Sequence, residues 1–313
     1  MFEHDASFGK VLPNFSQAVK TYKVEGFKAV VMFGLQFIYI RTLRKLLPGT
    51  SYTRYVPGID LGDILINRPR KILDGLFPRF KLNPYRELGL RLAHTCLTRP
   101  GDKVVIIGGG EGLTAVLAGK IVGGTGSVHV YDGLTGEDNQ WFGVSKILGN
   151  AKLNNVANVV TAEWAFVTPR EHLDDFDLYK KEGTVPPVVH PENLPDCDVL
   201  EMDANGAELE ILETMTIRPR VLIFELEAPF YKGYFKHRNR HPLEVLKLLN
   251  QLGYSVIKQT GHEGINLTQP ELLELVERQY ESENKVTLEN GAKDSPVLYC
   301  VRNDVSLATF QTS

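Results

Sequence analysis

From about residue 83 onward, short apolar runs alternate with segments in which apolar residues recur at helical spacing. The apolar runs predict strands at 103–107, 127–131, 156–161, 197–203, 220–226, 253–257 and 297–301, and the intervening segments predict helices at 85–98, 113–122, 141–153, 207–215, 241–252 and 269–280. The run 104–107 is apolar on both faces, as expected of a strand buried in a parallel sheet. We therefore predict a Rossmann-like, doubly wound α/β sheet of seven strands.

The first 80 residues lack this alternation and consist of helical segments interrupted by Pro48-Gly49, Pro57-Gly58 and Pro78. We predict two regions, a mainly helical N-terminal extension at 1–80 and an α/β domain at 81–313. The most apolar segment, 29–40, is shorter than the roughly 20 residues that a membrane-spanning helix needs. For residues 24–47 a buried helix or a homodimer contact is preferred, and peripheral contact with a membrane is the alternative.

Charge and cysteine content refine this picture. Residues 1–100 carry 16 Lys and Arg against 7 Asp and Glu, whereas residues 101–313 carry 19 against 31. The basic first part suits a membrane surface, a polyanion or an acidic partner, although a solvated helical face explains it equally well. The three cysteines are too far apart in sequence for a metal knuckle or redox pair, and no signal-peptide pattern is present. These features favour a reducing, cytoplasmic location.

The first predicted strand of the sheet leads directly into a glycine-rich turn, Gly108-Gly109-Gly110-Glu111-Gly112. Glycines let a ligand approach the main chain without meeting a Cβ. The second strand ends at Asp132, 20 residues after Gly112, where an acid that binds ribose hydroxyls is expected. Leu113 stands where a dinucleotide fingerprint needs a small residue. The turn, Glu111 included, and Asp132 therefore predict an S-adenosylmethionine site; a tight turn that binds nothing is the alternative.

The fourth predicted strand and the segments around it carry the most specific motif. Residues 198–212 read DVLEMDANGAELEIL, residues 219–226 read PRVLIFEL, and residues 150–159 read NAKLNNVANV. Together they resemble the FkbM family of S-adenosylmethionine-dependent methyltransferases over about residues 85–301. The matches include Asp203, Gly206, Glu208, Pro219 and Glu225.

The resemblance implies a class I methyltransferase fold, S-adenosylmethionine as methyl donor, and O-methylation of a hydroxyl on a sugar, a glycan or another small metabolite. Two residues depart from the family pattern, because Glu201 replaces a lysine and Asn205 replaces a glutamate. If the family residues act on the acceptor, that part of the site has changed here. Asn205 is therefore a candidate substrate-binding residue.

Several further residues are candidates for chemistry. Asp203, at the end of the fourth strand, is the first candidate for the base or acceptor-orienting group and also for cofactor contact; capping of the following helix is its alternative role. His241 is a second candidate base, although a histidine at a helix start is more often structural. Glu163 and Trp164, placed after the third predicted strand, are expected to flank the adenine, and packing of Trp164 into the core is the alternative.

The segment 232–241 interleaves basic and aromatic residues just past the fifth predicted strand. Lys236, Arg238 and Arg240 in it are candidates for gripping an anionic acceptor, and a solvated basic loop is the competing interpretation. We predict a metal-free site, because Asp198 lies at the opposite end of its strand from Asp203.

Other functional classes remain as alternatives. The acidic α/β domain argues against a DNA groove, and the Asp/Asn-Pro-Pro-aromatic motif of amino-methylating nucleic-acid enzymes is absent from the sequence. The basic N-terminal part keeps an RNA-directed methyltransferase open. A catalytically inactive binding or scaffold protein with the same fold is the other alternative, favoured by the two departures.

Overall fold

The computed structural model describes residues 35, 39, 46, 47, 49, 50, 53–55, 63–66, 70, 71, 87–134, 143–169, 185–204, 206–226, 240–281 and 295–306. Contacts divide the chain into two units, residues 1–53 with 68–83 and residues 54–67 with 84–313. Within the described ranges, no helix combines the length and the apolar character that crossing a membrane requires.

The described part of the first unit contains a short antiparallel pair, β1 (Gly49–Thr50) with β4 (Arg70–Lys71). Strands β2 (Thr53–Tyr55) and β3 (Ile64–Ile66), which belong to the second unit except for Thr53, form another pair. Four short strands between residues 49 and 71 depart from the mainly helical extension that the sequence predicts. Of the segment 24–47, only Leu35, Tyr39, Leu46 and Leu47 are described, the first three in helical conformation and Leu47 in a bend, so its predicted docking role lies outside the described residues.

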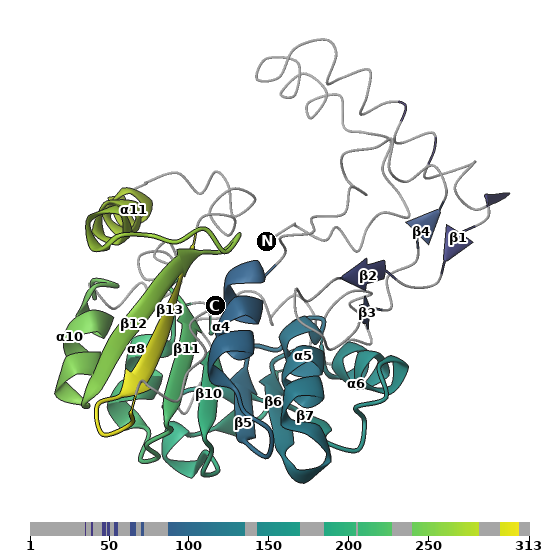
Figure 1. Ribbon diagram of the computed structural model, residues 1–313, viewed down its shortest axis with the longest axis horizontal. Helices are drawn as coiled ribbons and strands as arrows, with labels where there is room; N and C mark the ends of the chain where they lie inside the picture. The colour runs from purple at the N-terminus through teal and green to yellow at the C-terminus, as the bar shows by residue number, and fades with distance from the viewer. Residues whose placement is uncertain are drawn as a thin grey trace. The chain divides into compact units, whose positions relative to one another are not determined.

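The second unit is built on a seven-stranded sheet with the order β12-β13-β11-β10-β5-β6-β7 (Figure 1). Its strands are β5 (Lys103–Ile107), β6 (Ser127–Asp132), β7 (Val160–Trp164), β10 (Val199–Met202), β11 (Val221–Glu225), β12 (Tyr254–Gly261) and β13 (Pro296–Arg302). The pairings from β11 to β7 are parallel, and β13 runs antiparallel to both β11 and β12. This confirms the predicted Rossmann-like fold. The strand order reverses between β5 and β10, which makes their carboxyl ends the expected ligand-binding point.

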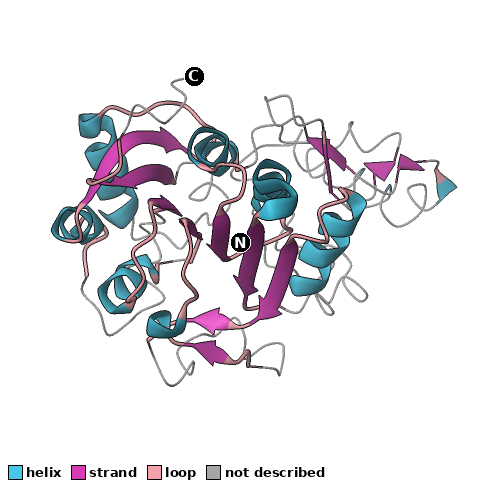
Figure 2. Ribbon diagram, turned by 60° about the horizontal axis from the view of Figure 1, so that its bottom comes forward, coloured by secondary structure: helices cyan, strands magenta, loops and turns pink. Residues whose placement is uncertain are grey.

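Helices cover both faces of this sheet (Figure 2). Helices α4 (Leu88–Leu97), α5 (Leu113–Val122) and α6 (Val144–Leu153) pack on one another and on β11, β6 and β7, respectively. Helices α8 (Glu208–Thr214), α10 (Glu244–Gln251) and α11 (Gln269–Glu281) bury their apolar residues in the core on the other face, which includes Leu200 and Leu222. Successive side chains along each buried strand therefore pack alternately against the helices of one face and against those of the other.

Most element bounds agree with the sequence prediction, but the third strand of the sheet does not. The predicted strand 156–161 is wrong, because Asn155 adopts a left-handed backbone (φ 58°) and Val156 donates its N–H to Ala151 at 3.0 Å, which turns the chain. The strand begins only at Val160, so Glu163 and Trp164 are its last two residues rather than residues that follow it.

Four minor elements complete the described chain: β8 (Phe166–Val167), β9 (Val188–Val189) and two 3₁₀ turns, η3 (Gly123–Thr125) and η4 (Pro191–Asn193). Strand β3 is held by helix α6. The side chain of Asn154 donates to the carbonyl of Leu65 at 2.6 Å and accepts from the N–H of Leu65 at 2.8 Å, as a neighbouring strand would. This clasp joins residues 63–66 to the sheet unit.

Removing this clasp should destabilise the second unit. In Asn154→Ala the N–H and C=O of Leu65 lose their partner, and we expect the free energy of unfolding to fall by about 1–3 kcal/mol. Lys152→Ala, an exposed change in the same helix, should stay within roughly 0.5 kcal/mol of the wild type. Urea unfolding of both variants tests this, and equal midpoints would show that the clasp is not structural.

Candidate functional site

The register of the parallel strands aligns four chain positions at the carboxyl edge of the sheet. The pairing of β5 with β6 and with β10 places Gly108, the residue after β5, level with Asp132 and with Asp203. The pairing of β10 with β11 continues this row to Glu225. One glycine and three carboxylates from four neighbouring strands therefore meet where ligands bind in open α/β sheets.

Gly108 lies so close to β10 that no side chain fits. Its φ is +87°, and a Cβ at this position would lie 2.0 Å from the carbonyl oxygen of Asp203. The N–H of Asp203 in turn donates to the carbonyl of Ile107 at 2.9 Å. Gly109 is buried, and a Cβ there would lie 2.3 Å from a methyl group of Val130. The first two glycines of the turn are thus fixed by packing against the sheet.

The second half of the turn is held by hydrogen bonds. Gly110 donates its N–H to Oδ2 of Asp132 at 2.8 Å, and its carbonyl accepts from the N–H of Gly143 at 2.9 Å. The buried side chain of Asn150, in α6, donates to the carbonyl of Glu111 at 2.7 Å. The chain then passes through Gly112, with φ +85°, into α5. The asparagine-rich stretch of the resemblance therefore supports the glycine turn.

Asp132 is almost completely buried, and both of its oxygens accept backbone hydrogen bonds. Besides Gly110, Leu134 donates its N–H to Oδ1 at 2.8 Å. Burial raises the pKa of Asp132 to about 6, because removing the carboxylate from water costs more than the two backbone N–H donors return. Each carboxylate oxygen has a second lone pair, so the group retains acceptor capacity for two hydroxyls.

This pKa predicts a pH-dependent site. If ribose hydroxyls bind the charged form of Asp132, affinity for S-adenosylhomocysteine should fall about tenfold between pH 7.5 and pH 5, measured by calorimetry. In the ligand-free protein, folding stability changes with pH in the opposite direction. The raised pKa of Asp132 stabilises the fold fully below the pKa of the unfolded chain, near 3.8, and this stabilisation is lost as pH rises through about 6. Asp132→Asn should bind weakly at every pH, whereas a wild-type affinity independent of pH would contradict this role.

The loop after β10 is shaped by Glu208. This fully buried carboxylate, the first residue of α8, accepts the N–H groups of Ala204 at 3.2 Å and Gly206 at 3.1 Å. Asp203 is half-buried beside Gly108, whereas Asn205 lies outside the described residues. Glu208 therefore fixes the backbone of the loop that begins at Asp203.

Glu201, the first departure from the family pattern, is buried in the sheet rather than exposed at its edge. Its carboxylate bonds to Nε2 of His94 in α4 and accepts from the hydroxyl of Thr114 in α5 at 2.8 Å. Nδ1 of His94 lies 2.8 Å from the hydroxyl of Thr98. Glu201 therefore takes part in a buried network that connects β10 with two helices, and an effect of this departure on acceptor binding stays a prediction.

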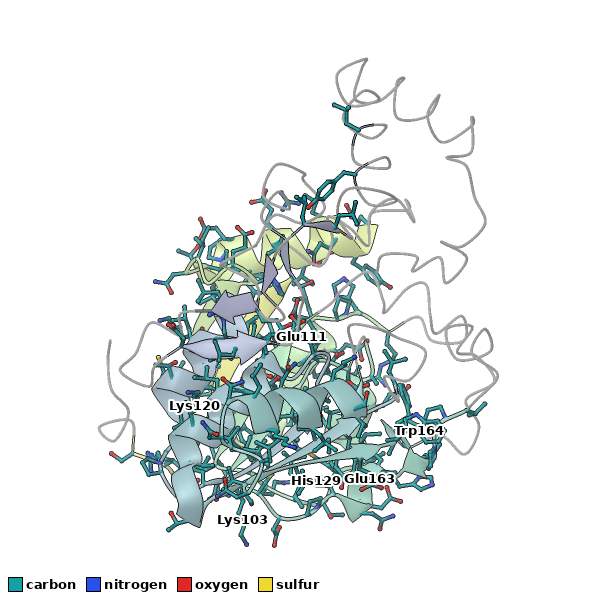
Figure 3. All side chains as sticks on the ribbon, turned by 90° about the vertical axis from the view of Figure 1, so that its right-hand side faces the viewer. Lys103, Glu111, Lys120, His129, Glu163 and Trp164 are labelled. Atoms are coloured by element: carbon teal, nitrogen blue, oxygen red, sulfur yellow. The ribbon has the colours of Figure 1, made fainter. Side chains whose placement is uncertain are left out.

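Glu163 and Trp164, the last two residues of β7, have different hydrogen-bond and ion-pair partners. The carboxylate of Glu163, about half exposed, lies 3.5 Å from Nε2 of His129, and Figure 3 shows the two side chains side by side. The indole N–H of Trp164 donates to the carbonyl of Gly133, directly after Asp132, at 3.0 Å. Trp164 is thus attached to the segment that carries the ribose-binding candidate. A contact of either residue with adenine stays a prediction.

Arg240, a candidate for gripping an anionic acceptor, forms ion pairs within the protein. Its guanidinium bonds to Glu213 of α8 at 2.7 Å and to Glu244 of α10 at 2.8 Å, and Glu213 is the main reason that its pKa is raised. Arg240 therefore links two helices. Lys236 and Arg238 lie outside the described residues.

His241 is surrounded by structural partners. Its Nδ1 accepts the N–H of Leu243 at 3.3 Å, and its Nε2 lies 3.3 Å from a carboxylate oxygen of Glu277 in α11. The ring also stacks edge-on against Tyr280, with centroids 4.4 Å apart. These contacts support the structural role of His241 at the start of α10 over the role of a base.

The sequence interpretation missed the partner of the third carboxylate at this edge. Glu225, noted only as part of the resemblance, is buried and bonds to His262, which follows β12. A glutamate that ends an apolar strand was a usable signal, whereas nothing in the sequence around His262 indicated a partner 37 residues away. Among the described residues, no group of three His, Cys, Asp or Glu side chains is arranged to hold a metal ion.

No family model matches the sequence, and no curated protein matches it. Solved structures similar to the chain include a SAM-dependent O-methyltransferase from Thermotoga maritima, with 13% identity over 69% of this chain and 64% of that chain and a TM-score of 0.34. An O-methyltransferase from Bacillus cereus in complex with SAH has 14% identity over 71% and 83%, with a TM-score of 0.36. Fibrillarin from Aeropyrum pernix with bound S-adenosyl-L-methionine has 12% identity over 82% and 100%, with a TM-score of 0.37. This chain thus spans less than two thirds of the Thermotoga protein, and we infer cofactor and reaction from its own residues.

Proposed function

We propose that the chain is an S-adenosylmethionine-dependent methyltransferase that acts on a hydroxyl of a sugar, a glycan or another small metabolite. The hydrogen bond from Gly110 to Asp132 carries this proposal, because it joins the glycine turn and the ribose-binding candidate in one site. Gly108 and Gly110 are partly exposed while Gly109 is buried, so a ligand can approach the main chain on one side of the turn.

The residues fit an adenosyl sulfonium better than a dinucleotide. Asp132 supplies acceptor capacity for two ribose hydroxyls, and Leu113 directly follows the turn where a dinucleotide fingerprint needs a small side chain. When bound, S-adenosylmethionine supplies a methyl group already activated for displacement. What the protein adds is alignment of the acceptor with that methyl group, which accounts for a large part of the rate in such reactions.

Asp203 is the proposed acceptor-orienting carboxylate next to the glycine turn. It lies level with Gly108 in the row of the carboxyl edge and is half-buried. A carboxylate at this position can accept a hydrogen bond from the acceptor hydroxyl and hold it in line for transfer. Glu208 fixes the loop behind it, so the position of Asp203 is constrained on both sides.

Cofactor binding tests this proposal against the inactive-scaffold and dinucleotide alternatives. Calorimetry of the full chain should detect binding of S-adenosylhomocysteine and none of NAD. Incubation with labelled S-adenosylmethionine and cell glycan or lipid extracts should then transfer label to an acceptor that is stable to protease and ribonuclease. Tight NAD binding, or label found only in RNA, would contradict the proposed donor or acceptor, respectively.

A further inference from the structure

The carboxyl edge has a second half that the cofactor candidates do not occupy. The glycine turn and Asp132 belong to β5 and β6, whereas the carboxyl ends of β11 and β12 and the beginning of β13 form the adjacent half. An acceptor aligned with the methyl group must come from a direction that the adenosine does not fill. Titratable groups in this half are therefore candidates for acceptor chemistry.

One buried pair of titratable side chains lies there. The carboxylate of Glu225 is 3% exposed, and its two oxygens lie 3.1 and 3.2 Å from Nδ1 of His262, whose side chain is 15% exposed. Ser295, directly before β13, also hydrogen-bonds to Glu225, and the charge of Glu87 lies close enough to affect it. Burial raises the pKa of Glu225, while the hydrogen bond from His262 opposes that rise.

The hydrogen bonds determine the tautomer of His262. The backbone N–H of Glu87 donates to Nε2 at 3.2 Å, so Nε2 carries a lone pair and the ring proton is on Nδ1, where it is donated to Glu225. The bond from Glu87 is at the long end of the usual range. An imidazole with a buried carboxylate on one nitrogen and an accepting lone pair on the other is the arrangement of a carboxylate-oriented base.

A purely structural role is the competing interpretation. The same turn anchors α4, because Gly89 donates its N–H to the carbonyl of His262 at 2.9 Å, and a Cβ at Gly89 would lie 2.8 Å from the carbonyl oxygen of Gly261. That backbone contact needs no imidazole, however, and no buried carboxylate. The side chain of His262 also contributes to this anchor, because Nε2 accepts the N–H of Glu87, but the buried carboxylate of Glu225 on Nδ1 is additional to what anchoring requires.

We propose that His262 is the proton acceptor for the acceptor hydroxyl and that Glu225 is its positioning residue; this rests on the proposed function. The hydroxyl takes the place of the Glu87 N–H as donor to Nε2. The O–H bond of the acceptor breaks and its proton goes to Nε2. The new O–CH₃ bond forms as the S–CH₃ bond breaks, and that electron pair stays on sulfur. Asp203 then orients the acceptor from the neighbouring strand.

Nitrogen NMR of the full chain, labelled at histidine, tests the pair without an acceptor. At pH 8 we expect His262 to show a protonated Nδ1 and a hydrogen-bonded, unprotonated Nε2. Glu225→Gln should lower the pH at which the ring gains its second proton by about one unit or more, because a stabilising negative charge is lost. Ser295→Ala should raise the pH at which the ring gains its second proton, since Glu225 then accepts one hydrogen bond fewer. A ring unaffected by either change would overturn the proposed pair.

The catalytic role is tested by labelled methyl transfer to glycan and lipid extracts from pH 5 to pH 9. His262→Gln should lower the saturating rate at least about 100-fold and remove the ascending limb of the pH profile. Affinity for S-adenosylhomocysteine should stay within roughly twofold of wild type, because the cofactor candidates lie in the other half of the edge. The control His190→Gln changes a histidine before η4 that bonds to neither Glu225 nor a cofactor candidate, and it should keep both rate and profile.

Two results would overturn the role of His262. One is a folded His262→Gln that transfers methyl groups at the wild-type rate. The other is a His262→Gln variant that loses the same fraction of the rate at every pH, together with Glu225→Gln and Ser295→Ala variants whose ascending limb stays at the wild-type pH. That combination is expected if His262 only anchors α4. If the wild type fails to bind S-adenosylhomocysteine, the proposed function itself is contradicted.

Discussion

Gly108→Ala is expected to abolish binding of S-adenosylhomocysteine, with an affinity loss of more than about 100-fold. The new Cβ would lie 2.0 Å from the carbonyl oxygen of Asp203, and the φ of +87° is unfavourable for any residue with a Cβ. Rotation of a side chain cannot relieve a contact between Cβ and a backbone atom. The glycine turn must therefore move away from β10, and the row that aligns Asp132 with Asp203 is lost.

A matched glycine in the same layer provides the control. Gly149 lies exposed in α6, and a Cβ there would meet nothing within 4 Å. Gly149→Ala should therefore keep wild-type affinity and raise the free energy of unfolding by about 0.5–1 kcal/mol, because alanine favours the helix. Calorimetry and thermal unfolding of both variants decide the matter. Wild-type affinity in Gly108→Ala would mean that the cofactor binds elsewhere.

Glu201→Lys, which restores the residue of the FkbM pattern, is expected to destabilise the protein by about 3–5 kcal/mol. The reason lies in the buried network: lysine would place its charge against His94 in α4 and leave Thr114 without its carboxylate acceptor. Chemical denaturation of the full chain measures this loss. Glu201→Gln keeps the shape without the charge and should cost less.

His94 provides the double-mutant control for this network. A lysine at 201 should be tolerated better in the background His94→Leu, because the opposing imidazole is then absent, and the two changes should not add. Additive losses, or a Glu201→Lys variant as stable as the wild type, would show that the network contributes little. In that case the departure from the family pattern would again require a functional explanation.

The sheet was predictable because its strands differ sharply in pattern from its helices. Strand β5 and helix α5 were predicted with their observed bounds, since the buried run 104–107 ends in a cluster of glycines, which is typical of a turn. The third strand was misplaced because Val156 and Val159 are buried in a turn and so imitate the burial of a strand. Burial alone does not distinguish the two conformations.

The proximity of the glycine turn and Asp132 was predictable for a related reason. Glycines and an acid at strand ends are local signals, and parallel pairing brings such ends together without further information. The pair of Glu225 and His262 depends instead on β13 inserting between β11 and β12, which no local pattern encodes. Likewise, the clasp between Asn154 and Leu65 joins residues 89 positions apart. Long-range partners of polar side chains therefore had to come from the structure.

A crystal structure of the full chain with S-adenosylhomocysteine tests the central claim most directly. The account predicts ribose hydroxyls within hydrogen-bond distance of the Asp132 carboxylate and the sulfur beside Gly108, facing Asp203. A ligand bound away from the glycine turn, or with its ribose hydroxyls far from Asp132, would contradict it.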